Sequence, residues 1–256
     1  MQPLSSSYAV GLLSAVISPD ICVTCRARER GRQAMVEKLI EKTGPSVQLP
    51  STAQSKGERT RERVLDVAYQ SIVEKGFAAT SIEELVEAAG ITKSGFFYHF
   101  RDKNDLAREL FERFLAEDQG IIDTLESRAR ELSDDPLQSM LIFLNLYAQM
   151  MDDMETLHPG CMVASVAYQE RMFDAELKRM NVEYLIRMRE RFRDWFTEIS
   201  AKYPLQLDVD RDALADHLTT IVEGSIVMSR ALKDEALMGK QTRLFRGYVK
   251  LLFGAE

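Results

Sequence analysis

The chain has 256 residues, of which 45% are hydrophobic and 29% are charged, and its formal net charge at pH 7 is -7. This composition is typical of a soluble globular protein and excludes a polybasic protein that coats DNA without reading its sequence. The charge is uneven, because residues 1–105 carry 14 basic and 13 acidic side chains and the acidic excess falls in residues 106–256. A near-neutral N-terminal part can still make a few phosphate contacts.

The first 55 residues differ in composition from the rest of the chain. They contain Ser and Pro clusters and an arginine run, so we expect a flexible arm. Two alternatives are that translation begins at Met35 and that the arginine run touches DNA. Cys22 and Cys25 have CxxC spacing without a second CxxC or a His pair, which favours two free thiols over a metal or redox site. The apolar run at residues 8–17 is too short to span a bilayer, and we expect a cytoplasmic protein without a membrane segment.

Helical periodicity becomes clear at residues 59–75, where apolar side chains recur at steps of three and four. Gly76 is a typical C-cap residue for this helix. Ser81 and Glu84 have the spacing of a capping box, which predicts the start of a second, short helix. Gly90 then ends that helix.

Thr92 is a second N-cap candidate, and it precedes a short aromatic helix at residues 93–100. Asp102 caps the next, longer helix. Two short helices joined by a tight Gly-containing turn, with a supporting helix before them, form a helix-turn-helix. The order of these elements is more specific than any single residue in it.

The rest of the chain is also predicted to be helical. One helix begins at Asp135-Pro136, and the sequence His158-Pro159-Gly160 interrupts the chain. A long helix then carries apolar residues from Phe173 to Ile199, and two further helices follow at about residues 210–232 and 240–253. We find no alternating strand pattern and no internal repeat.

Residues 80–103, with the sequence TSIEELVEAAGITKSGFFYHFRDK, closely resemble the DNA-binding head of the TetR family of regulators. The resemblance extends from Arg59 to Leu106 and combines spacing, helix caps and the aromatic-His-Phe ending. The remaining residues resemble the family only in being helical and of suitable length. The resemblance implies a homodimer that binds a palindromic operator on double-stranded DNA and is released from it by an unknown small-molecule inducer. Repression and activation both remain open.

We therefore expect an all-α fold with three parts. These are the flexible arm at residues 1–55, a helix-turn-helix head at residues 56–104 and a helical ligand-binding and dimerisation domain at residues 105–256. We expect no cofactor and no bound metal.

The second helix of a helix-turn-helix enters the major groove, where its first residues meet base edges. Lys93 can donate to guanine and Ser94 can pair with several bases. By resemblance, phosphate contacts and groove contacts together involve the following residues: Ser81, Thr92, Lys93, Ser94, Gly95, Tyr98, His99 and Lys103. Many family members have Tyr at the position of Phe97, so either Tyr98 replaces that phosphate contact or the contact is lost.

Two further sets of residues are candidates for the dimer interface and the ligand pocket. Apolar stripes on the last two helices predict an interface made of Leu214, Leu218, Ile221, Gly224, Ser225, Met228, Leu244, Tyr248 and Leu251, although an internal core is the alternative for each. Methionine suits adaptable apolar sites, and the pocket candidates are Met150, Met151, Met154, Cys161, Tyr168, Met172 and Trp195. Cys161 near His158 is a candidate sensor of electrophiles, with a buried inert thiol as the alternative.

No catalytic motif is present, because the chain lacks GxSxG, HExxH and Walker-type sequences and its three histidines lie in separate segments. We therefore expect a DNA-binding regulator and not an enzyme. The alternative is a helical adaptor protein with a degenerate head.

Overall fold

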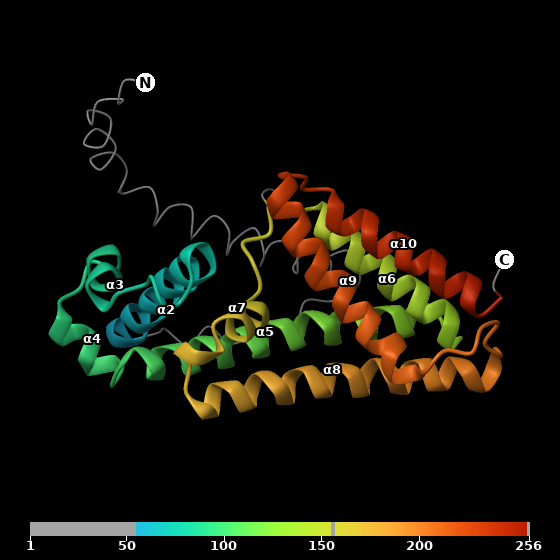
Figure 1. Ribbon diagram of the computed structural model, residues 1–256, viewed down its shortest axis with the longest axis horizontal. Coiled ribbons are helices and arrows are strands. Elements are labelled where there is room, and N and C mark those ends of the chain that lie inside the picture. The colour runs from blue at the N-terminus through green and yellow to red at the C-terminus, as the bar shows by residue number, and fades with distance from the viewer. Residues whose placement is uncertain (1–54, 155–156, 255–256) are drawn as a thin grey trace, which may run out of the picture. The chain divides into compact units, whose positions relative to one another are not determined.

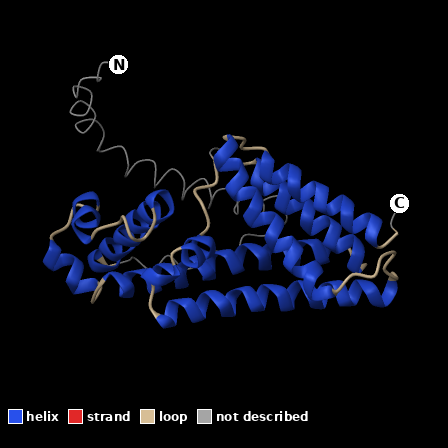
Figure 2. Cartoon of the chain, viewed as in Figure 1, coloured by secondary structure: helices blue, strands red, loops and turns tan. Residues whose placement is uncertain are grey.

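The computed structural model of the chain describes residues 55–154 and 157–254. The arginine run, Cys22, Cys25 and Met35 lie outside these residues. Within them every regular element is a helix and none is a strand (Figures 1 and 2), which confirms the expected all-α fold. None of the helices in this part of the chain combines the length and the hydropathy that a membrane-spanning helix needs.

Three helices form the head: α2 at Lys56–Lys75, α3 at Ile82–Ala88 and α4 at Lys93–His99. The α2 helix starts three residues before the expected position, because Ser55 and Glu58 form a capping box there. The capping box predicted at Ser81 is present at the start of α3. Each helix of the head therefore begins at a side chain that accepts a backbone N–H.

A small apolar core holds the head together. Val64 and Leu65 of α2, Leu85 of α3, and Phe96 and Phe100 at α4 are all almost fully buried. The Phe96 and Phe100 rings lie 5.4 Å apart between centroids. Burial of large aromatic side chains on one face of α4 leaves its opposite face free for solvent or a ligand.

The remaining helices form the larger helical domain: α5 at Lys103–Leu132, α6 at Pro136–Asp152, α7 at Met162–Tyr168, α8 at Ala175–Lys202, α9 at Arg211–Leu232 and α10 at Leu237–Leu252, with a short 3-10 helix at Glu170–Met172. In Figure 1, α6, α9 and α10 lie together and α8 runs along α5. The aromatic residues Phe143, Trp195, Phe196 and Phe245 are among the largest fully buried side chains of this domain.

The segment between α6 and α8 differs from the sequence-based expectation. Met162–Tyr168 forms a separate helix that the periodicity did not indicate. Phe173 does not lie on the long helix, because it is extended (φ -106°, ψ 151°) and the side chain of Asp174 caps α8 by accepting from the Leu177 amide at 2.9 Å. Phe173 is thereby free to pack outside the helix.

This segment joins the larger domain to the head. The Phe173 ring lies 4.4 Å from the ring of Phe77, which follows α2. The backbone N–H of Ala78 donates to Gln169 Oε1 at 3.2 Å. Gly76 has a φ of +89°, and a Cβ there would lie 2.7 Å from Gln169 Nε2, so only glycine fits both the backbone and the contact. The loop after α2 is thus held directly by the residues after α7.

Candidate DNA interface

The N-terminal residues of α4 are fixed by a local hydrogen-bond network. Thr92 Oγ1 accepts from the Gly95 amide at 3.1 Å and lies 3.0 Å from Ser94 Oγ. A Cβ on Gly95 would approach Thr92 Oγ1 to 3.3 Å, so a larger residue would press on the cap. Thr92 and Gly95 therefore shape the helix start, while Lys93 and Ser94 are the exposed residues that can meet base edges.

Lys93 is paired in the free protein with a residue of α3. Its Nζ lies 2.7 Å from Glu83 Oε1, and both side chains are mostly exposed. The hydrogen bond and charge of Lys93 lower the pKa of Glu83. Solvent screens an exposed pair of this kind and keeps it weak, so DNA can take over the lysine at little cost.

The aromatic side chains of α4 divide into buried and exposed members. Tyr98 is 84% exposed and Phe97 is 47% exposed, whereas Phe96 is fully buried. His99 is half-buried, and its ring meets the Tyr98 ring edge-on at 5.0 Å. Phe97 has no hydroxyl to contact a phosphate. The exposed phenol of Tyr98 is available for such a contact instead.

Ser81 and Lys103 are placed at helix starts, as expected, but both already have partners. Ser81 Oγ accepts from the Glu84 amide at 3.2 Å, and Glu84 reaches back to the Ser81 amide at 3.0 Å. Lys103 Nζ donates to the carbonyl of Phe77 and lies 4.0 Å from the centre of the Phe77 ring. Burial lowers the pKa of Lys103. An ammonium has three donors, so the Phe77 contact leaves others for a phosphate.

Sequence reasoning missed the cations at the start of α2. Lys56 and Arg59 are exposed there, and the adjacent Gly57 lies close to the His99 ring at the end of α4, since a Cβ on Gly57 would be 3.9 Å from His99 Cε1. The start of α2 thus borders the α4 surface. Only this packing, and no local motif, indicates that these two cations belong with the interface.

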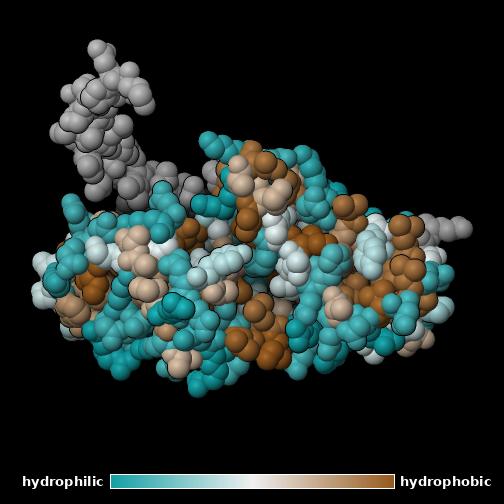
Figure 3. Space-filling model, in the orientation of Figure 1, coloured by the Kyte–Doolittle hydropathy of each residue, from teal (hydrophilic) through white to brown (hydrophobic). Residues whose placement is uncertain are grey.

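The candidate dimer residues divide into two groups. Leu214, Leu218 and Ser225 are buried inside the subunit, so their contacts are accounted for by its own core. The exposed or half-buried group comprises Ile221, Gly224, Met228, Leu244, Tyr248 and Leu251. Leu244 is 68% exposed and Leu251 is 76% exposed. Apolar surface is visible over α9 and α10 in Figure 3.

The structure does not bring all the pocket candidates together. Trp195 donates from Nε1 to the carbonyl of Pro136 at 3.1 Å, at the first residue of α6. Met150 lies 14 residues further along α6, roughly 21 Å away at 1.5 Å per residue. Tyr168 is 81% exposed and Met172 is 47% exposed, so neither lines an interior site. Met150, Met151 and Cys161 are buried, and Met154 is half-buried.

Cys161 has an environment that favours the thiol over the thiolate. Its Sγ donates to Glu223 Oε1 at 2.8 Å, while His158 Nδ1 accepts from the Gly160 amide at 3.2 Å. Burial, followed by the negative charge of Glu223, raises the pKa of the Cys161 thiol. The sequence-based hypothesis of a thiolate stabilised by His158 is therefore not supported by this arrangement.

Comparisons with known proteins agree with the geometry of the head. A family model described as "Bacterial regulatory proteins, tetR family" matches residues 64–110. The chain is 40% identical over 55 residues to the HTH-type transcriptional regulator AcrR of Shigella flexneri. This match covers 22% of this chain and 26% of AcrR. It is 25% identical over 201 residues to the transcriptional regulator AcuR of Cereibacter sphaeroides, which covers 73% of this chain and 88% of AcuR.

Solved structures extend the likeness to the larger domain. A TetR-family transcriptional regulator from Agrobacterium tumefaciens superposes with a TM-score of 0.63 at 20% identity, covering 75% of this chain and 98% of that one. A TetR regulator from Chloroflexus aurantiacus gives a TM-score of 0.61 at 23% identity and covers 76% of this chain and 96% of that one. At these identities the likeness establishes the fold, with a helix-turn-helix head followed by a helical domain.

Proposed function

The chain belongs to the TetR family of DNA-binding transcriptional regulators, and we propose that it is a homodimeric repressor released from a palindromic operator by a small molecule. It would bind its operator DNA in the cytoplasm. The observation that carries the proposal is the first turn of α4, where Lys93 and Ser94 are exposed on a helix anchored by Phe96. We propose no catalytic activity for it.

The exposed stripes of α9 and α10 support the homodimer. Met228, Leu244 and Leu251 are each at least half exposed although they are large and apolar. A Cβ built on Gly224 or Gly247 meets no atom within 4 Å, so another helix can approach both positions closely. Size-exclusion chromatography with light scattering tests the dimer, and Leu244→Glu should convert a dimer into a monomer. A wild-type monomer would contradict the proposal.

The operator is tested by selecting random duplexes on the purified protein and comparing the winners with scrambled DNA at fixed salt. An enriched palindrome with half-sites about one helical turn or more apart supports a dimeric operator binder. Weak, salt-sensitive binding without enrichment would instead favour the helical adaptor with a degenerate head.

Two lysine variants separate base reading from phosphate binding. Lys93→Ala should weaken operator binding by roughly 1–3 kcal/mol and relax base preference, because it removes a donor to a base edge. Lys103→Ala should weaken binding to operator and random DNA alike and lower the salt slope by about one unit. Fluorescence anisotropy over a salt series measures both effects. Equal losses for the two variants on both DNAs would contradict this division of roles.

A further inference from the structure

Polar side chains from four helices converge inside the larger domain. Cys161, at the start of α7, donates to Glu223 of α9. Tyr184 of α8 donates its hydroxyl to Asp118 of α5. The two pairs are close enough to affect one another, since the Asp118 charge acts on Glu223 and Cys161 acts on Tyr184. We call Asp118, Cys161, Tyr184, Glu223 and their neighbour Asn181 the interior cluster.

Two oxygen atoms at the interior cluster are enclosed and have no hydrogen-bond partner. One is Oε2 of Glu223. The other is Oδ1 of Asn181, which is only 6% exposed and uses its Nδ2 to donate to the carbonyl of Val163 at 3.4 Å. Most buried polar groups in folded proteins are paired, so these two unpaired acceptors are open to a donor from outside the chain.

The charges of the interior cluster indicate that the external hydrogen-bond donor should be positively charged. Burial and the Asp118 charge raise the pKa of Glu223 against the opposing hydrogen bond from Cys161. No lysine or arginine of the described residues forms a salt bridge with Glu223. An enclosed carboxylate oxygen without a positive partner is costly, and a cation that donates hydrogen bonds removes that cost. An anion would add a third negative charge.

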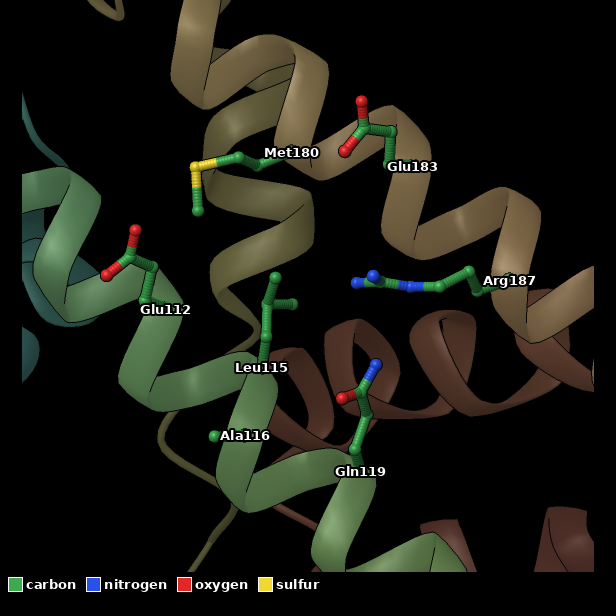
Figure 4. A pocket seen from close by; sticks show the side chains of 7 residues that line it. All are labelled: Glu112, Leu115, Ala116, Gln119, Met180, Glu183 and Arg187. Carbon is green, nitrogen blue, oxygen red and sulfur yellow. The ribbon is translucent and has the colours of Figure 1, made fainter.

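A groove lies between α5 and α8, the helices that carry Asp118 and Tyr184 (Figure 4). It has a volume of about 260 Å³, and its lining includes Gln119 of α5 and Met180, Glu183 and Arg187 of α8. Asp118 directly precedes Gln119 in α5, and Tyr184 is one helical turn from Met180 and from Arg187 in α8, so the groove and the Asp118–Tyr184 pair share the same two helices. In Figure 4 the Leu115, Met180 and Arg187 side chains point into the space between the two helices.

We propose that the interior cluster binds the effector of this regulator and that the effector is an organic cation, a protonated amine attached to an apolar body. The ammonium donates to Glu223 and Asn181. This inference rests on the proposed ligand-released regulator.

Calorimetric titration of the full chain without DNA tests the site directly. The probes are 2-phenylethylamine, its neutral counterpart 2-phenylethanol and the anion 3-phenylpropanoate at pH 7. We expect the amine to bind at least about tenfold more tightly than the alcohol, the usual effect of hydrogen bonds to a charged group, and the anion to give no binding heat. Equal affinity for amine and alcohol, or no binding of the amine at millimolar concentration, would overturn the proposal.

Three variants locate the cation. Glu223→Gln and Asp118→Asn keep side-chain size and should reduce amine affinity to that of the alcohol. Glu190→Gln removes an exposed carboxylate of α8 and should leave the amine preference unchanged. Circular dichroism verifies that each variant is folded. Retention of the amine preference in folded Glu223→Gln would contradict the assigned site.

Operator release separates this inference from the proposed function. If the amine binds and lowers operator anisotropy, both are supported. If it binds without releasing DNA, the cation site stands and release by this ligand fails. If a palindrome is bound but no amine binds, the regulator stands and the cation site is wrong.

Discussion

The head and the larger domain treat buried polar groups in opposite ways. In the described residues 55–102, every enclosed side-chain nitrogen or oxygen has a hydrogen-bond partner, and Ser55, Ser81 and Thr92 each cap a helix. In the larger domain, enclosed oxygens without a hydrogen-bond partner occur at Asn104, Glu109, Asn181, Asp212 and Glu223. The head therefore satisfies its own polar groups, whereas the domain after it leaves some unpaired, and the proposed effector would satisfy those of Asn181 and Glu223.

The contrast also appears in the apolar cores. The head depends on a few fully buried side chains, so the loss of one removes a large share of its stability. The larger domain has many more buried side chains, distributed along six helices. Damage to the head core should therefore abolish DNA binding before it affects the rest of the chain.

The largest effect is expected for Phe96→Ala. Phe96 is fully buried, and loss of such a side chain costs about 3–5 kcal/mol. We expect hydrogen exchange to accelerate in residues 56–100, operator binding to be lost and the oligomeric state to remain. Phe97→Ala is the matched control, because its ring is half exposed and its loss should change stability by less than about 1 kcal/mol. Intact operator binding by Phe96→Ala would refute the role of this core.

A smaller effect is expected where the two regions meet. Gln169→Ala removes the hydrogen bond to the Ala78 amide, at a cost of about 0.5–1.5 kcal/mol. We expect operator affinity to stay near the wild-type value while a bound effector releases the operator less completely. Anisotropy titrations with and without effector measure the difference, and Arg171→Ala, an exposed neighbour, is the control. Unchanged release would show that coupling does not pass through Gln169.

The smallest effect concerns pH and the contact between α2 and α3. Lys75, followed by the Ser81 amide, lowers the pKa of Glu84 from 4.5 to about 2. Because the folded-state pKa is the lower one, the stabilisation by Glu84 is present above pH 4.5 and is lost as pH falls toward 2. Glu84→Gln retains the capping contact and loses the charge, so its melting temperature should differ from wild type at pH 7 and converge with it only as the pH falls through about 2. A constant difference would contradict this assignment.

The head could be predicted from the sequence because its signals are local. Ser81, Thr92 and Asp102 each precede a helix whose third residue supplies the capped amide, and these caps are present in the structure. Tyr98 and Lys93, which the sequence predicts as DNA contacts, are both exposed on α4. The partners of Lys93 and Lys103 could not be anticipated, since Glu83 and Phe77 lie 10 and 26 residues away.

The ligand site depends on contacts between distant segments, and the sequence was less informative there. Methionine and aromatic content favoured Trp195 as a pocket residue, yet its indole N–H is satisfied by Pro136 at the far end of α6. Cys161 was selected for its chemistry, but its partner Glu223 is 62 residues away. Glu223 lies on a helix whose pattern indicated only dimerisation and core, so no periodicity could single it out.

The α5 helix has a consequence for making hybrid regulators. Its 30 residues begin at Lys103, shortly after α4 ends at His99, and continue past Asp118 in the interior cluster. A new sensing domain grafted onto this head must be joined within α5 in unbroken helical register. Insertion or deletion of one residue would turn every later side chain by about 100° and carry the sensing residues away from their partners. Successful chimeras should therefore recur only at junction lengths that restore whole helical turns.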